Sequence, residues 1–191
     1  MRKRFDSAIS SCIELEQWDV VRNRLQNDTE RKRSYKIYKS KMSALHLACQ
    51  HNPPADIIKM LLDANPMTAS ARSHPFGELP LHFATGQNMA SEEVIQLIAE
   101  ANKSAISAQT TQGISPLHQA CTFNAPLGVL KILVNKNPEA VFIKDCHDRT
   151  PFDVAKVMYF IFYPQTWKIL YLLSGGRTKQ IKGQPFIFPE D

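Results

Sequence analysis

The sequence predicts an all-α fold, a solenoid of stacked helix-turn-helix units. A seven-residue motif recurs without gaps at a period of 36 residues, in segments 43–49, 79–85 and 115–121. An apolar helical pattern follows each copy at matched positions, and a chance recurrence of the motif would not bring that pattern along. The length of 191 residues corresponds to about five such units, so we expect a repeat array and not a single globular core.

Each unit is expected to begin with a short helix whose two ends are marked in the sequence. Ser43 and Ser115 stand at the first position and can cap the exposed backbone N–H groups, whereas Leu79 in the second copy cannot. Proline at the next position, as in Pro80 and Pro116, suits the first helical turn. At the other end of the helix, an asparagine can adopt the left-handed conformation that ends a helix. These asparagines are Asn52, Asn88 and Asn124.

A second helix is expected in each unit. Apolar side chains recur at the i, i+3 and i+4 spacing of a buried helical face. Two prolines, Pro66 and Pro138, are expected to end this helix in the first and third copies. In the first copy the apolar stripe consists of Ile57, Ile58, Leu61 and Leu62.

The repeated motif is SALHLA at 43–48, LPLHFA at 79–84 and SPLHQA at 115–120, and a divergent fourth copy is TPFDVA at 150–155. These motifs resemble the ankyrin repeat, whose signature is T-P-L-H-x-A. The resemblance implies two antiparallel helices per unit, a finger between successive units, and a protein-binding function without catalysis. The period of 36 residues exceeds the usual value of about 33, so we expect longer fingers.

The resemblance also implies a structural role for the recurring histidines, His46, His82 and His118, which would bond neighbouring backbone and hold the turn. It implies a glycine just before each motif, and Gly77 and Gly113 stand in that place. Lys41 and Asp148 replace this glycine in the other two copies.

The chain divides into four predicted parts. We expect an N-terminal helical cap with a basic first finger at 1–41, three ankyrin repeats at 42–149, a C-terminal capping repeat at 150–176 and an irregular tail at 177–191. The apolar stripe of the N-terminal cap is Ile9, Cys12, Ile13, Leu15, Trp18, Val21 and Leu25. The last helix of the C-terminal cap is expected to contain Trp167, Ile169, Leu170, Leu172 and Leu173. The aromatic stretch 157–164 is either a lid over the last interface or a partner-binding patch.

The formal charge of +5 is concentrated at the N-terminal end, because residues 1–41 hold 11 basic and 6 acidic side chains while the remainder is neutral. The basic patch Arg31, Lys32 and Arg33 begins a cationic segment that extends to Lys41. Three interpretations stay open: a solvated loop, a site for an acidic protein partner, and a nuclear-import or nucleic-acid contact. A uniformly basic nucleic-acid-binding domain is a poor fit, so nucleic acid is the less favoured partner.

No catalytic constellation, cofactor site or metal site is predicted. Cys146 and His147 are a nucleophile and a base by residue type alone, and adjacent residues in a turn rarely point at each other. No CxxC pair or phosphate-binding loop occurs. No apolar run approaches the roughly 18 residues of a membrane span, and no secretory signal is recognisable. We therefore expect an intracellular protein, cytoplasmic or nuclear, and a monomer.

The predicted function is that of a non-catalytic interaction module or adaptor, which binds a protein partner through its concave face and fingers. The alternative is a basic-arm protein associated with nucleic acid or nuclear regulation. The resemblance implies that the fingers and the first helices line the concave face, so the expected contact positions lie on the fingers and at the ends of the first helices. At the helix ends, matched positions vary between units. They are Lys36, Tyr38, Lys39, Lys41, Gln50, His51, His74, Phe76, Gln87, Asn88, Gln109, Gln112, Phe123, Asn124, His147 and Arg149.

Overall fold

The computed structural model describes residues 9–27, 42–87 and 90–161, and every regular element in these ranges is a helix. The α-helices are α1 (Ile9–Glu14), α2 (Trp18–Leu25), α4 (Ala44–Gln50), α5 (Ala55–Ala64), α6 (Pro80–Thr85), α7 (Glu92–Ala101), α8 (Pro116–Thr122), α9 (Leu127–Lys136) and α10 (Pro151–Ile161). Three short 3-10 helices follow the longer ones: η1 (Pro66–Ser70), η2 (Lys103–Ser107) and η3 (Pro138–Phe142).

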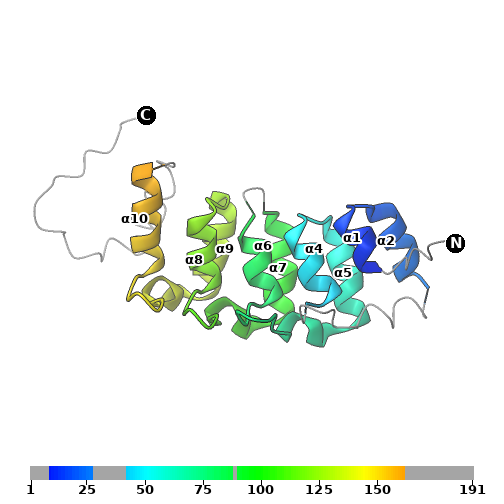
Figure 1. Cartoon of the computed structure of the whole chain (residues 1–191), viewed down its shortest axis with the longest axis horizontal. Helices are drawn as coiled ribbons and strands as arrows, with labels where there is room; N and C mark the ends of the chain where they lie inside the picture. The colour runs from blue at the N-terminus through cyan, green and yellow to red at the C-terminus, as the bar shows by residue number, and fades with distance from the viewer. Residues whose placement is uncertain (1–8, 28–41, 88–89, 162–191) are drawn as a thin grey trace, which may run out of the picture.

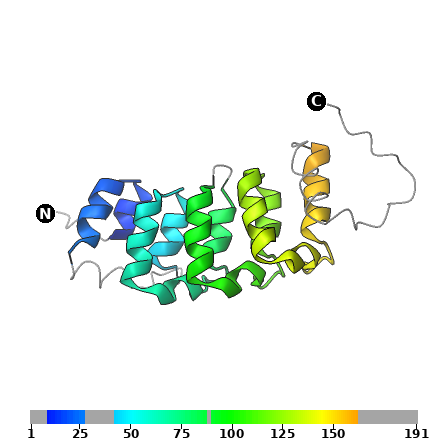
Figure 2. The same ribbon diagram turned by 180° about the vertical axis from the view of Figure 1, so that it is seen from behind.

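The helices stack into an elongated array, with α1 and α2 at one end and α10 at the other (Figure 1). The first helices α4, α6 and α8 form one row, on the side facing the viewer in Figure 1. The second helices α5, α7 and α9 form a parallel row, which Figure 2 shows from behind. Each first helix packs on its own second helix and on the first helix of the next unit. The all-α repeat fold predicted from the sequence is confirmed.

The first helices begin as the sequence predicts. The hydroxyls of Ser43 and Ser115 accept hydrogen bonds from the backbone N–H groups of His46 and His118. Leu79 makes no side-chain cap, and its helix α6 begins with Pro80. The position is still stabilised, because its backbone N–H donates to the imidazole of His82.

The second helices end at an asparagine in all three repeats. Asn65, Asn102 and Asn137 have extended backbone with φ of −155°, −142° and −150°, one residue after the helix. Pro66 and Pro138 follow at the expected places, yet α7 ends equivalently although Lys103 stands there. Proline is therefore not required for this helix end, and the recurring asparagine is the shared determinant.

The core is continuous along the array and lies between the two rows of helices. The predicted stripe of α5 is buried, and so are its equivalents on α7 and α9. At the N-terminal end, Ile13, Val21 and Leu25 are buried as expected. Leu15 was predicted to join them, but its residue is 67% exposed because α1 ends at Glu14 and Glu16 turns the chain with φ of 52°. The last predicted helix, with Trp167 to Leu173, lies outside the described residues.

The fingers are short. A backbone hydrogen bond closes each finger over five or six residues, from Ser73 to Glu78, Thr110 to Ile114 and Asp145 to Arg149. The expected lengthening of the fingers is wrong for these three, because the chain after each second helix first forms a 3-10 turn of five residues. Positive φ values at Gly77, Gly113 and Asp148 confirm that all three fingers need the left-handed conformation at this position.

Candidate functional site

The three repeated histidines form a ladder that joins successive units. In His46, His82 and His118, Nδ1 accepts a hydrogen bond from the backbone N–H three residues earlier. Since Nδ1 is the acceptor, Nε2 carries the proton and donates to a carbonyl of the next finger. These Nε2 bonds reach Glu78, Ile114 and Arg149 over 3.2, 3.1 and 2.9 Å. The rings therefore hold each finger on the preceding helix.

Burial keeps the histidine ladder uncharged. Desolvation lowers the pKa of His46 and His82 to about 4, and it lowers the pKa of His118 as well. The nearby thiols are also part of the packed interior, because burial raises the pKa of Cys49 and Cys121. Among the described residues, no three His, Cys, Asp or Glu side chains come together as a metal site.

Side chains at one repeated position tie neighbouring fingers together. Arg72 Nη1 donates to the carbonyls of Gly77 in its own finger and Gln109 in the next. Gln109 Nε2 in turn donates to Gly113 and to Lys144 of the third finger. Gln109 was predicted to contact a partner, but the structure commits its amide to this bridge between fingers.

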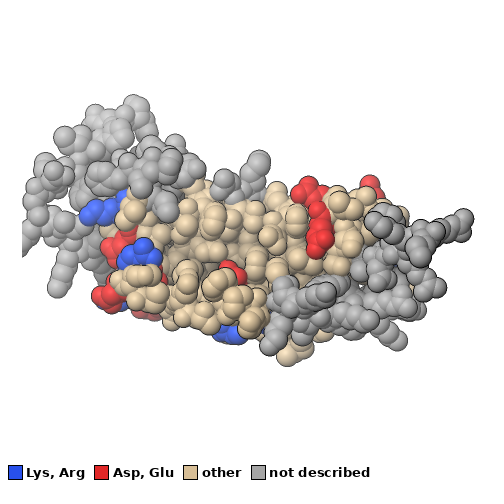
Figure 3. Space-filling view, viewed as in Figure 1, with Lys and Arg blue, Asp and Glu red and all other residues tan. Residues whose placement is uncertain are grey.

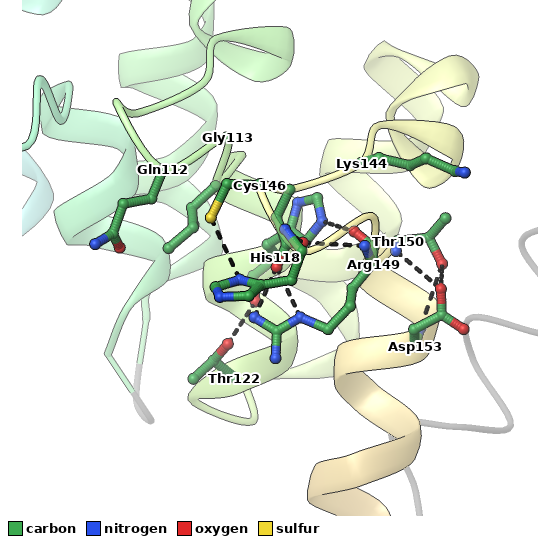
Figure 4. A network of polar contacts seen from close by, with 12 residues as sticks. Gln112, Gly113, His118, Thr122, Lys144, Cys146, Arg149, Thr150 and Asp153 are labelled. Carbon is green, nitrogen blue, oxygen red and sulfur yellow. Dashed lines mark hydrogen bonds and ion pairs between the residues drawn. The ribbon is translucent and has the colours of Figure 1, made fainter.

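The third finger is organised around the buried carboxylate of Asp145 (Figure 4). Oδ1 accepts from the backbone N–H groups of His147 and Arg149, and Oδ2 accepts from the Arg149 guanidinium. Burial alone would raise the pKa of Asp145, but the bonds from Arg149 and His147 outweigh it and lower the pKa to about 2. Arg149, a predicted contact residue, is thus held in an ion pair within the finger.

Cys146 and His147 approach each other more closely than expected. The sulfur lies 3.3 Å from His147 Nδ1, so the expectation that these adjacent side chains point apart is wrong (Figure 4). The cause is the Asp145 turn, which reverses the chain at this point. Both side chains are exposed on the finger.

A groove of about 550 Å³ lies on the row of first helices, across α4, α6 and α8. Three of the predicted contact residues line it: Gln50, Gln87 and Phe123. The remaining lining residues escaped the sequence prediction, and they are Asn52, Glu78, Phe83, Gly86 and Gln119. The groove is the place where the structure brings predicted contact positions of three repeats together.

A signal for the missed residues existed in the repeat alignment. Phe83 and Gln119 occupy the variable position between the histidine and the alanine of the motif, where Leu47 stands in the first copy. Phe83 and Gln119 are partly exposed on the first-helix row, whereas Leu47 is buried at the matched position. Gly86 likewise matches Gln50, so its missing side chain deepens the groove at this point.

The groove is almost uncharged. Segments 42–55, 79–91 and 115–130, which contain the first helices, hold no Asp, Glu, Lys or Arg. The space-filling view shows few charged side chains over this middle part of the array (Figure 3). Glu78 is the single ionisable residue among the groove-lining side chains.

The other predicted contact residues are distributed around this groove. His51 Nδ1 lies 3.5 Å from Glu16 Oε1. Asn124 follows its helix with a left-handed φ of 51°, and Asn52 has a φ of 46°, which confirms the predicted conformation at both positions. On the fingers, His74, Phe76, Gln112 and His147 are exposed. Their binding role stays a prediction. The residues Arg31, Lys32, Arg33, Lys36, Tyr38, Lys39, Lys41 and Asn88 lie outside the described residues.

Paired helices, a histidine ladder and tight fingers define a helical repeat solenoid. Residues 40–71 match the family model for the ankyrin repeat. This match supports the resemblance to the ankyrin repeat that the sequence motifs predict. No curated protein matches the chain. Within the described ranges, no helix combines the length and apolar character that a membrane span requires.

Proposed function

We propose that the chain is a non-catalytic protein-interaction module that binds a segment of a protein partner in the groove over α4, α6 and α8. The groove is the observation that supports this function. It joins residues of three units, and its lining positions differ between units while the histidine ladder beneath them is constant. A surface released from packing can be adapted to one partner without loss of the fold.

The chemistry of the groove suits a polypeptide. Its lining combines the amides of Gln50, Asn52, Gln87 and Gln119 with the rings of Phe83 and Phe123. The amides offer both donors and acceptors to a peptide backbone. Phe123 is 43% exposed and provides apolar area at the end of α8.

The test is partner capture with a variant whose groove is filled. Gly86 has an ordinary φ of −80°, and Gln and Thr stand at its matched positions, so Gly86→Leu introduces a side chain without backbone strain. The side chain would occupy the groove beside Gln119. We expect this variant to lose the protein captured by the wild type, whereas Gln96→Leu on the exposed side of α7 retains it. Equal capture by both variants would refute the groove as the binding site.

The contribution of the basic first finger is tested separately. A variant with Lys36, Lys39 and Lys41 changed to Glu should lose an acidic partner if this finger contacts it. Retention of the same partner by the charge-reversed variant would place the contact elsewhere on the array.

A further inference from the structure

We propose that the groove selects a basic peptide segment, in which a cationic side chain sits against Glu78 and an apolar side chain about four residues away sits against Phe123. This inference rests on the proposed function, because it names the chemistry of the partner segment for the same groove.

One end of the groove is built as a cation site. The imidazole of His46 donates to the backbone carbonyl of Glu78, and its ring stacks edge-on against Phe83 with 5.6 Å between the ring centroids. His46 therefore positions Glu78 and Phe83 at the same end of the groove, near the base of the finger. A carboxylate beside an aromatic ring attracts ammonium and guanidinium groups by charge and by the ring quadrupole.

Among the described residues, Glu78 has no cationic partner. Within the described part of the chain, no ion pair joins Glu78 to a Lys or Arg, and Arg72 of the same finger bonds to backbone carbonyls instead. Glu78 is half-buried, and this burial raises the pKa of its carboxyl although a hydrogen bond from Ser73 acts in the opposite direction. A cation from a partner would supply the missing charge and stabilise the carboxylate.

The other end of the groove is uncharged. Gln50, Gln87 and Phe123 lie at or just beyond the ends of α4, α6 and α8. The six residues of α6 rise by about 9 Å, at about 1.5 Å per residue, and Phe123 lies one helix further along the row, on α8, at an additional spacing of about 10 Å. An extended peptide that runs diagonally from Glu78 to Phe123 covers this distance in about four residues. The partner segment therefore combines a cationic and an apolar side chain with this spacing.

The charge of the surroundings favours the same occupant. The first helices and the loops after them contain no cation that would repel a basic peptide and none that would attract an acidic one. An acidic segment would place like charge beside Glu78, which is unfavourable in a partly desolvated groove. The acidic partner considered for segment 31–41 would therefore bind at a different place from this groove.

The probe is a fluorescein-labelled octapeptide of alanine and glycine with one arginine and, four positions later, one leucine. Two matched peptides replace the arginine by citrulline or by glutamate. We expect the 191-residue chain to bind the arginine peptide at least tenfold more tightly than either matched peptide, measured by fluorescence polarisation at low salt. Equal affinities for the arginine and citrulline peptides would overturn the proposal.

The protein side of the test uses Glu78→Gln, which removes the charge and keeps the backbone carbonyl that holds His46. Glu93→Gln on the exposed side of α7 is the matched control, with the same chemical change away from the groove. We expect a tenfold or larger loss of affinity for the arginine peptide in the first variant and none in the second. Equal loss in both, or in neither, contradicts a site at Glu78.

The two proposals fail separately. If Gly86→Leu abolishes partner capture but Glu78→Gln does not, the groove binds protein and the cation site is wrong. A third outcome concerns the chain's own basic segment. If changing Arg31, Lys32 and Arg33 to Gln strengthens binding of the arginine peptide, then segment 31–41 competes for the groove. In that case the occupant of the groove is segment 31–41 and not a separate partner.

Discussion

The interior of the array and the groove on its surface are built by the same short helices, yet they follow opposite rules. In the interior, each unit repeats the same residue, and every histidine of the ladder makes the same two hydrogen bonds. In the groove, matched positions differ, as in Phe83 and Gln119 or in Gln50 and Gly86. Residues that repeat in every unit thus stack the units, and residues that vary are available for binding. We therefore expect interior substitutions to lower stability and groove substitutions to weaken binding.

The largest effect on stability is expected from the ladder. His82→Ala removes a fully buried ring and leaves the N–H of Leu79 without its partner. The carbonyl of Ile114 loses one of the two hydrogen bonds that it accepts and keeps the one from Thr110 N–H. We expect a loss of about 4 kcal/mol in the free energy of unfolding, combining a cavity with one unpaired backbone N–H. Urea unfolding followed by circular dichroism measures this loss.

The groove provides the contrasting variant. Gln87→Ala truncates a side chain that lines the groove and packs little, so its unfolding free energy should stay within about 0.5 kcal/mol of the wild type. If the two substitutions destabilise the protein equally, the separation between interior and groove is wrong.

The ladder also predicts a dependence of stability on pH. The folded pKa of His46 and His82 is about 4, below the ordinary value of 6.5, so these rings stay neutral in the array while the unfolded chain takes up protons. Stability therefore falls as the pH drops from 6.5 towards 4. At pH 5.5 the two rings together should cost about 3 kcal/mol relative to pH 7.5.

Urea titrations at pH 7.5 and 5.5 measure this cost, and the imidazole NMR signals of the folded protein provide the control. These two rings should show no titration above pH 5. Asp145 does not change the stability between pH 5.5 and 7.5. Its pKa is lowered from 3.8 to about 2, so its stabilising effect is lost only as the pH falls below 3.8. An identical stability at the two pH values would contradict a neutral ladder.

The next effect distinguishes two glycines that occupy the same place in successive fingers. Gly113 has φ of 74°, and a Cβ there would lie 2.9 Å from backbone atoms of Asp145 and Cys146 in the next finger. Gly77 has φ of 68°, but its Cβ would meet only side-chain atoms at 3.6 Å or more. We expect Gly113→Ala to cost about 3 kcal/mol and Gly77→Ala about 1 kcal/mol, because only the former adds a backbone clash to the strain.

Thermal unfolding of the two variants side by side measures this difference. Equal costs would show that the neighbouring finger moves aside freely, and the fingers would then not be held as tightly as the bridges from Arg72 and Gln109 imply.

Much of the interior could be predicted from the sequence because its signals repeat. Three copies of one motif placed the first helices and the structural histidines, and the left-handed Asn52 and Asn124 follow the same logic. The asparagines at 65, 102 and 137 recur at spacings of 37 and 35 residues, so an alignment without gaps at a period of 36 does not superimpose them.

The groove was less predictable because its determinants do not repeat. Gln50, Gln87 and Phe123 were found at the ends of the first helices, whereas Glu78 lies on a finger and reaches the groove only through the stacking of units. Adjacent side chains in a turn usually point apart, and this rule predicts no contact between Cys146 and His147. The hydrogen bonds to the buried Asp145 shape this turn so that the two side chains meet. Contacts between units depend on how the units stack, and one sequence without its relatives does not show this.

The smallest expected effect has the opposite sign and concerns Gly128 in the first turn of α9. Its backbone is helical, so glycine here lacks the conformational reason that applies in the fingers. A Cβ would meet the end of the Glu92 side chain, which is exposed and free to move aside. Gly128→Ala should therefore stabilise the protein by about 0.5–1 kcal/mol through helix propensity, measured as a higher urea midpoint. A lower midpoint would show that Glu92 is fixed on α9, and the second-helix row would then be as constrained as the fingers.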